Sequence, residues 1–234
     1  MRGAARRAVF VGNSGWYIGP MIAMIKSFSR RPTHVLAVLA LLAAAPLRAQ
    51  GFDYYVLALS WSPTWCAGDP DRRSSEQCDP SRDLGFTLHG LWPQYDAGGW
   101  PQDCHSRERD ATRGQTAAMA DIMGTGGLAW YQWKKHGRCS GLSAGDYFDS
   151  ARLAYTLLSL PEPRGAITAA ELERDFIAAN PGLDGDEVIV TCRGGQVQEV
   201  RICLTTGLEP RSCSRDVLED ACRSGGPLDV PDPP

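Results

Sequence analysis

The first apolar segment of the chain covers residues 35–45, VLAVLALLAAA. It follows a stretch that contains Lys26 and Arg30, and the small residue Ala49 comes shortly after it. A basic region, an apolar region and a small residue, in that order, are typical of a secretory signal peptide. The alternative is a membrane anchor, but the run is well short of the about 20 apolar residues that cross a bilayer. We therefore expect residues 1–49 to be removed, which predicts a secreted or periplasmic protein without membrane attachment.

Strand-like patterns lie at both ends of the remaining chain. Residues 53–61 form an apolar run rich in β-forming residues, and residues 85–93 read as a short strand that runs into a Gly-Pro turn. Residues 187–192 and 197–204 flank a Gly-Gly turn at 193–196 and predict a β-hairpin.

Helical spacing dominates the middle of the chain. Residues 112–123 are rich in alanine, and residues 127–137 repeat aromatic residues at helical spacing until Gly137, a natural helix end. Residues 143–160 begin with a serine cap, and Thr168 caps a further helix over 169–180.

These elements predict one α+β domain over residues 50–226, with an antiparallel central sheet packed against several helices. The segments 67–83 and 95–105 are polar or rich in Gly and Pro, and we expect loops there. The proline-rich segment 227–234 is predicted to be a disordered tail. The 185 residues that follow Ala49 are enough for one hydrophobic core.

The charge balance changes once the first segment is set aside. Seven of the 24 basic residues precede position 50, whereas all 27 acidic residues follow it, so the later part has a formal charge of −10. Affinity for nucleic acids normally depends on basic surface that neutralises phosphates. An RNA-binding protein of this composition would need a locally positive cleft, and we expect it to bind weakly and release quickly.

Eight cysteines follow residue 49, and an even number behind a signal peptide is typical of disulfides in an oxidising compartment. The alternative is a zinc site, but no pair has CxxC spacing and no spacing between neighbours matches a zinc motif. We therefore expect no bound metal. Four disulfides are expected among Cys66, Cys78, Cys104, Cys139, Cys192, Cys203, Cys213 and Cys222.

Three histidines follow the predicted signal peptide. His89 lies at the end of a predicted strand, from which its side chain can project into a cleft. His136 closes a predicted helix, with Gln132 one turn earlier and Lys135 beside it, and the helix dipole favours the cationic form of such a histidine. Two imidazoles can act as acid and base near neutral pH. A lone histidine on a helix is more often structural, so the pattern alone leaves both readings open. His105, next to a cysteine, is taken as non-catalytic.

Two segments carry a resemblance to a known family. FTLHGLWPQY at 86–95 and WYQWKKHGRC at 130–139 resemble the two active-site segments of the ribonuclease T2 family, the secreted acid-type endoribonucleases. Residues 52–66 resemble the family's first strand and residues 98–104 its following loop. Residues 200–213 resemble the bacterial, periplasmic ribonuclease I-like branch.

The resemblance implies cleavage of single-stranded RNA in two steps. His136 would take the proton of the ribose 2′-hydroxyl, His89 would protonate the departing 5′-oxygen, and Lys135 would stabilise the charged phosphorane. The products would be a 2′,3′-cyclic phosphate and, more slowly, a 3′-phosphate. Because the nucleophile belongs to the substrate, no metal or other cofactor is expected. RNA would be the partner of a monomeric enzyme.

The chain departs from the family pattern at two positions. The family usually has a His-Glu pair where this chain has Tyr131 and Gln132. We expect Gln132 to donate a hydrogen bond in the catalytic step and Tyr131 to contribute to substrate binding. The result would be an enzyme roughly 10- to 100-fold slower than a Glu-bearing relative, a barrier increase of one or two units of about 1.4 kcal/mol. The alternative function is a catalytically impaired RNA-binding or interaction protein of the same fold, and a third is a structural module of the cell envelope.

Aromatic residues provide surfaces for bases. By resemblance, Trp92 and Trp100 would stack on the base 5′ to the cut, with Gln94 available for an edge contact. Stacking tolerates sequence, so low base specificity is expected. Trp65 and Tyr95 stay undecided between packing and binding. Core packing is expected for three further tryptophans, Trp61, Trp130 and Trp133.

The resemblance also implies a disulfide pairing, which spacing alone cannot select. The implied pairs are Cys66–Cys78, Cys104–Cys139, Cys192–Cys222 and Cys203–Cys213.

Overall fold

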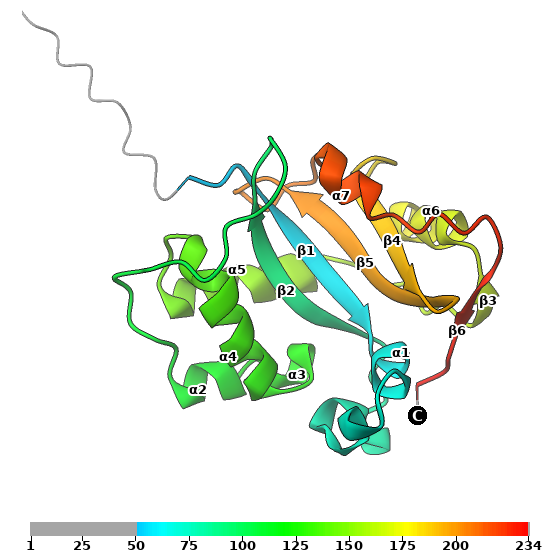
Figure 1. Cartoon of the computed structure of the whole chain (residues 1–234), viewed down its shortest axis with the longest axis horizontal. Helices are drawn as coiled ribbons and strands as arrows, with labels where there is room; N and C mark the ends of the chain where they lie inside the picture. Colours follow the sequence, from blue (N-terminus) through cyan, green and yellow to red (C-terminus); the bar gives the residue numbers. More distant parts are fainter. Residues whose placement is uncertain (1–50, 234) are drawn as a thin grey trace, which may run out of the picture. The chain divides into compact units, whose positions relative to one another are not determined.

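The computed structural model describes residues 51–233, so the expected signal peptide at 1–49 lies outside the described residues. A six-stranded sheet forms the centre (Figure 1). All of its strand pairs are antiparallel except the short β5–β6 pair. The strand order is β2 (Phe86–Gln94), β1 (Tyr54–Trp61), β5 (Gln196–Leu204), β6 (Leu228–Val230) and β3 (Gly165–Ile167), with β4 (Val188–Arg193) also paired to β5. The predicted α+β fold with an antiparallel central sheet is confirmed.

Helices occupy the middle of the sequence as predicted. Thr168 and Glu171 form a reciprocal capping box at the start of the sixth helix, as its sequence favours. The expected helix over 112–123 is divided into two at Ala118 and Met119, which keep right-handed backbone angles but belong to neither helix, and Met119 is buried. The helices are α1 (Ser62–Ala67), α2 (Arg113–Ala117), α3 (Ala120–Met123), α4 (Gly126–Lys135), α5 (Ala144–Thr156), α6 (Ala169–Ala179) and α7 (Arg215–Glu219). Within residues 51–233, no helix is both long and apolar enough to cross a membrane.

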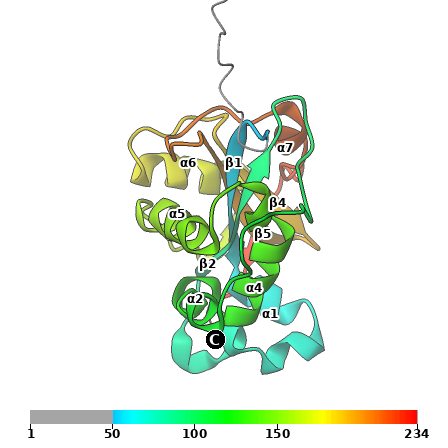
Figure 2. The ribbon, with the colours of Figure 1, turned by 90° about the vertical axis from the view of Figure 1, so that its left-hand side faces the viewer.

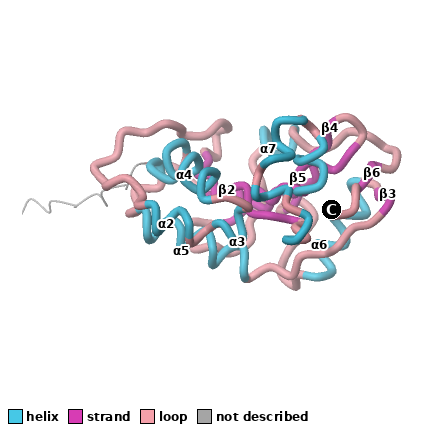
Figure 3. Tube along the Cα trace, turned by 90° about the horizontal axis from the view of Figure 1, so that it is seen from below, coloured by secondary structure: helices cyan, strands magenta, loops and turns pink. Residues whose placement is uncertain are grey.

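The two faces of the sheet have different coverings. In β1, Tyr55, Leu57 and Leu59 belong to the main core, which also includes residues of α5 and α6. Tyr54 and Val56 face the other way, into a smaller apolar cluster that includes a residue of α7. Figure 2 shows α5 and α6 on one side of the sheet, and Figure 3 shows α7 on the other. Helix α4 contributes Ala129 and Trp133 to the main core. Because both faces of β1 are covered, this strand is an uninterrupted apolar run.

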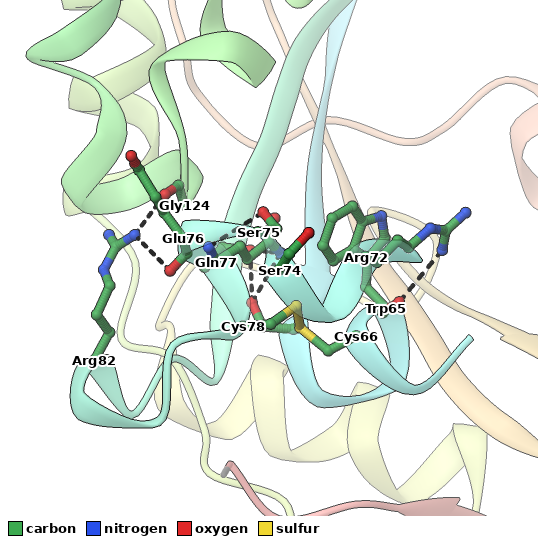
Figure 4. Close-up of a disulfide and its surroundings, with 12 residues drawn as sticks. Trp65, Cys66, Arg72, Ser74, Ser75, Glu76, Gln77, Cys78, Arg82 and Gly124 are labelled. Atoms are coloured by element: carbon green, nitrogen blue, oxygen red, sulfur yellow. Dashed lines mark hydrogen bonds between the residues drawn. A yellow bond between two sulfur atoms is a disulfide. The ribbon is translucent and has the colours of Figure 1, made fainter. Parts of the chain in front are cut away.

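The four disulfides are the pairs that the resemblance implies: Cys66–Cys78, Cys104–Cys139, Cys192–Cys222 and Cys203–Cys213. Figure 4 shows how Cys66–Cys78 fastens the polar segment 67–83 to α1. This segment is a series of short 3₁₀ turns, and Arg82 anchors it by donating to the main-chain oxygens of Ala120 and Gly124.

Two expectations about local structure are wrong. The proline-rich end is not entirely disordered, because residues 228–230 form β6, and Pro231 accepts a hydrogen bond from the Trp61 indole at 2.9 Å. Leu228 and Val230 alternate at a strand spacing and are buried, which outweighs the flanking prolines. The turn expected near Pro93 is absent, since β2 continues to Gln94. As β2 lies at the edge of the sheet, the missing N–H of proline is tolerated there.

The three tryptophans expected in the core differ in their burial. Trp61 and Trp133 are buried in the main core as predicted. Trp130 is 41% exposed on the outer face of α4, so its assignment to the core was wrong. The aromatic spacing of α4 turns only one of its two tryptophans inward.

Candidate active site

His89 occupies a β-bulge in the middle of β2, not the strand end expected from the sequence. Ala58 pairs with Gly90 and Leu59 pairs with Leu88, so His89 is an extra residue without a partner in β1. A bulge bends the strand locally and redirects a side chain. Here it brings the imidazole to the face of the sheet that also carries Trp92.

A buried carboxylate holds the His89 ring. His89 Nδ1 lies 2.5 Å from Oε1 of Glu199, and Arg201 donates through Nε to the other carboxylate oxygen at 3.0 Å. Burial opposes ionisation of Glu199, but the hydrogen bonds and charges of His89 and Arg201 outweigh it and keep the pKa of Glu199 below its usual value. Because a carboxylate only accepts hydrogen bonds, Nδ1 must be the donor. The other ring nitrogen, Nε2, is left for proton exchange.

His136 is in a different environment at the end of α4. It is the C-cap residue, it is 6% exposed, and its Nδ1 is buried without a hydrogen-bond partner. Burial, followed by the positive charges of Lys135 and His89, lowers the pKa of His136 to about 3. The expectation that the helix dipole would favour the cation was therefore wrong, because desolvation outweighs it. The neutral ring can accept a proton.

Trp92 links the two histidines. Its ring centroid lies 5.1 Å from that of His89 and 5.4 Å from that of His136. The indole Nε1 donates to Oε1 of Gln132 at 2.8 Å, and the Arg201 guanidinium lies 5.4 Å from the ring centroid. Each of the two imidazoles thus contacts the same indole ring.

Gly90 makes this arrangement possible. A Cβ atom at Gly90 would lie 2.3 Å from Trp92 Nε1 and 2.5 Å from Gln132 Oε1, far inside contact distance. The glycine in HGLWP is therefore required by the close approach of these two side chains.

Gln132 and Tyr131 lie outside the cleft formed around these residues. Gln132 is 1% exposed, and its amide oxygen is engaged by Trp92. Tyr131 is 52% exposed, and its hydroxyl accepts a hydrogen bond from Lys135 Nζ at 3.2 Å. Gln132 thus orients Trp92, and Tyr131 orients Lys135.

A cleft of about 320 Å³ opens beside His136. The loop that carries Trp100 is fixed on both sides of this cleft. Gly99 N–H donates to Asp216 of α7 at 2.6 Å, and Asp103 N–H donates to the Lys135 carbonyl at 2.7 Å. The cleft is lined by Val56, Trp92, Gln94, Trp100, Gln102, Lys135, His136, Arg201, Asp216, Val217 and Asp220.

A second cavity, of about 500 Å³, lies on the other side of the site and includes His89 and Glu199 in its lining. Trp65, left undecided above, lines it together with Arg72 and Arg193. The Arg72 guanidinium lies 5.0 Å from the Trp65 ring centroid. Two cations and an aromatic ring thus adjoin His89.

The structure gathers most of the predicted site residues. Lys135, His136, Trp92, Gln94 and Trp100 share the first cleft, and His89 adjoins Trp92. His105 is exposed and lines neither cavity. Within residues 51–233, no cluster of three or more His, Cys, Asp or Glu side chains is placed to hold a metal ion.

Sequence reasoning missed Glu199 and Arg201. Both lie on β5 two positions apart, so they point to the same face of the sheet. An acid and a base that alternate with the apolar residues Val200 and Ile202 are the signal that could have identified them.

A family model for the ribonuclease T2 family matches residues 52–213, which is more than half of the chain and includes both histidines. The chain belongs to the ribonuclease T2 family. The resemblance drawn from the two histidine motifs is thereby confirmed.

Curated members of the family include bacterial and plant proteins. A ribonuclease of Aeromonas hydrophila is 47% identical over 100 residues, 43% of this chain and 43% of the relative. Ribonuclease 3 of Arabidopsis thaliana is 32% identical over 115 residues, 44% of this chain and 51% of the relative. Ribonuclease I of Escherichia coli strain K12 is 30% identical over 135 residues, 42% of this chain and 50% of the relative. The chain spans about half the length of the curated relatives it matches.

Solved structures of the family share the fold. An RNase-related protein from Calystegia sepium has a TM-score of 0.63 at 22% identity, over 78% of this chain and 98% of that one. RNase NT in complex with 5′-AMP has a TM-score of 0.56 at 19% identity, over 78% and 100%.

Proposed function

We propose that this chain is a secreted or periplasmic endoribonuclease that cleaves single-stranded RNA without a metal. The product would be a 2′,3′-cyclic phosphate, followed by slower hydrolysis to a 3′-phosphate. The observation that carries the proposal is the pair of histidines that both contact Trp92, one neutral through burial and one held by a carboxylate.

The two environments suit the two proton transfers of the reaction. Neutral His136 takes the proton of the 2′-hydroxyl, whose oxygen attacks phosphorus. Protonated His89, stabilised by Glu199, gives its Nε2 proton to the departing 5′-oxygen. A pKa of about 3 makes His136 a weak base in the free protein, and a bound phosphodiester anion would raise that pKa. Lys135 and Arg201, which line the cleft, would stabilise the charged phosphorane.

The two cavities would hold the two nucleotides. The nucleotide 5′ to the cut would occupy the cleft beside His136, with its base on Trp92 or Trp100 and its edge near Gln94. The departing nucleotide would lie beside His89 in the second cavity. RNase NT, a structural neighbour described in complex with 5′-AMP, supports a nucleotide ligand for this fold. Stacking without base-edge readout favours low base specificity.

The test is incubation of the oxidised, secreted protein with the dinucleotide UpA in EDTA, with the products separated by chromatography. We expect cyclic uridine phosphate from the wild type, none from His89→Ala or His136→Ala, and full activity from His105→Ala. Absence of the cyclic product from the folded wild type would contradict the proposal. Sedimentation of the same sample tests the expected monomer.

The second candidate function is an impaired RNA-binding protein, which Tyr131 and Gln132 favour. It predicts that UpA binds and stays intact. Gln132→Glu then tests why cleavage is impaired. Glutamate keeps an acceptor for the Trp92 indole and restores a group that exchanges protons. A gain of cleavage in that variant would assign the impairment to Gln132.

A further inference from the structure

The outer face of α4 exposes two large aromatic rings. Trp130 is 41% exposed and Tyr131 is 52% exposed, whereas Ala129, Gln132 and Trp133 are buried on the inner face. Exposed aromatic surface beside a binding cleft commonly marks a site of interaction.

Each of these rings is paired with a lysine one turn later. Lys134 Nζ lies 5.6 Å from the Trp130 ring centroid, and Lys135 Nζ lies 5.6 Å from the Tyr131 ring centroid. These are the only lysines after residue 50, in a segment with a formal charge of −10. One acidic side chain, Asp110, approaches Lys134 at 3.8 Å. Both lysines of the acidic segment after residue 50 therefore lie beside two exposed rings.

This aromatic and basic face is continuous with the proposed catalytic cleft. Lys135 lines the cleft and also donates a hydrogen bond to Tyr131. The cleft beside His136 is where the nucleotide 5′ to the cut would lie. A strand leaving that cleft past Lys135 would next reach Tyr131 and Trp130.

We propose that the outer face of α4 binds single-stranded RNA on the 5′ side of the cleaved bond. The bases stack on Trp130 and Tyr131, and the phosphates contact Lys134. Aromatic platforms interleaved with cations are the usual means of binding single strands without sequence preference. This inference rests on the proposed function, because the direction of the strand follows from the roles of His136 and His89.

The experiment measures cleavage by the secreted, oxidised protein of three substrates, each with a single cleavable uridine. They are UpA, UpA extended by four thymidines on the 5′ side, and UpA extended by four thymidines on the 3′ side. For the wild type we expect 5′ extension to raise kcat/KM about tenfold, the contribution of one stacked base. Trp130→Ala and Lys134→Ala should remove most of that gain, while the values for UpA and for the 3′-extended substrate stay within about twofold of wild type.

Two variants serve as controls. Leu157→Ala removes an apolar side chain that is 65% exposed at the C-cap of α5, and it should change none of the three values. Trp130→Phe keeps an aromatic platform and should keep most of the gain. Equal losses on all three substrates in Trp130→Ala would mean a structural role and would overturn the proposal. An unchanged 5′ gain would overturn it as well.

A binding measurement with a strand that cannot be cleaved tests this proposal independently of the proposed function. The dissociation constant for an all-deoxy oligothymidine, which lacks the 2′-hydroxyl and stays intact, should rise about tenfold in Trp130→Ala. That shift is expected even if the wild type does not cleave UpA. If the variant instead changed only the sedimentation of the protein, the face would be a contact between copies of the chain and the RNA proposal would be wrong.

Discussion

At the scale of single residues, the two histidines have different surroundings. His89 is partly exposed, and its Nδ1 is paired with the buried carboxylate of Glu199. His136 has no such partner, and burial disfavours its cation. Two imidazoles in such different surroundings suit the proposed reaction, which requires one base and one acid.

Removal of the Glu199 charge tests its effect on the acid. In Glu199→Gln, Nδ1 of His89 keeps a hydrogen-bond partner but loses the charge that stabilises the imidazolium. We expect kcat for UpA to fall roughly 10- to 100-fold with little change in KM.

The leaving group provides the control for this prediction. A uridine 3′-(4-nitrophenyl) phosphate has a leaving group that departs without protonation, so Glu199→Gln should barely affect its cleavage. Glu209→Gln, an exposed glutamate, should behave as wild type on both substrates. Equal losses on the two substrates would show that Glu199 acts on folding and not through His89.

The buried His136 should make stability depend on pH. Its pKa is about 3 in the folded state against an ordinary value of 6.5, so below pH 6.5 the unfolded chain takes up the proton first. Stability should therefore decrease as the pH falls from 6.5 toward 3, by at most about 1.4 kcal/mol per pH unit for this group. Urea unfolding at pH 7, 5.5 and 4 should show a shallower decrease for His136→Gln than for wild type or His105→Gln. Parallel curves would contradict the burial argument.

Sequence reasoning found the histidines but not their surroundings. The motifs around His89 and His136 are contiguous, so a resemblance could identify them. Glu199 is 110 residues away from His89, and only the pairing of β1 with both β2 and β5 brings the two together. The burial of His136 likewise depends on tertiary packing and not on its helix.

At the scale of elements, the bulge in β2 is the feature that builds the site. It lets Leu88 and Leu91 stay in the main core while His89 and Trp92 reach the opposite face. Gly90, inside the bulge, leaves the space in which Trp92 meets Gln132.

Gly90→Ala should damage the site through crowding. The new methyl group would overlap both Trp92 and Gln132, so one side chain must move and their hydrogen bond must break. We expect a loss of about 1–3 kcal/mol in the free energy of unfolding and a large fall in UpA cleavage. Chemical denaturation and the UpA assay measure the two effects. Gly114→Ala, which meets only Thr112 at 3.9 Å, should cause neither, and a neutral Gly90→Ala would contradict the packing described.

Elements with strong sequence periodicity could be predicted. Features that depend on the pairing of strands distant in sequence could not. The Thr168 cap identified α6, and alternation identified β4 and β5. The bulge at His89 depends on the register with β1, which no local pattern encodes. Likewise, the prolines around β6 outweighed its two apolar residues in the sequence, although these fill a place in the core.

At the scale of the whole molecule, an acidic chain must bind a polyanion through few cations. The formal charge after residue 49 is −10, and the cleft also carries Asp216 and Asp220 on its α7 side. The cations placed to meet phosphate in the first cleft and on the outer face of α4 are Lys134, Lys135 and Arg201, and only Arg72 and Arg193 are added in the lining of the second cavity. The affinity for RNA should therefore depend only weakly on salt, in contrast to proteins with a broad basic surface.

This weak dependence can be measured as a slope. Each phosphate contact on a single strand contributes about −0.7 to the slope of log affinity against log salt, so three cations predict a slope of about −2. With the 5′-extended UpA substrate below saturation, log kcat/KM should follow that slope, and Lys134→Ala should make it shallower by about 0.7. Arg164→Ala, which removes an exposed cation paired with Glu162, should leave it unchanged. A slope several times steeper would mean that the strand follows a basic surface other than the cleft and the outer face of α4.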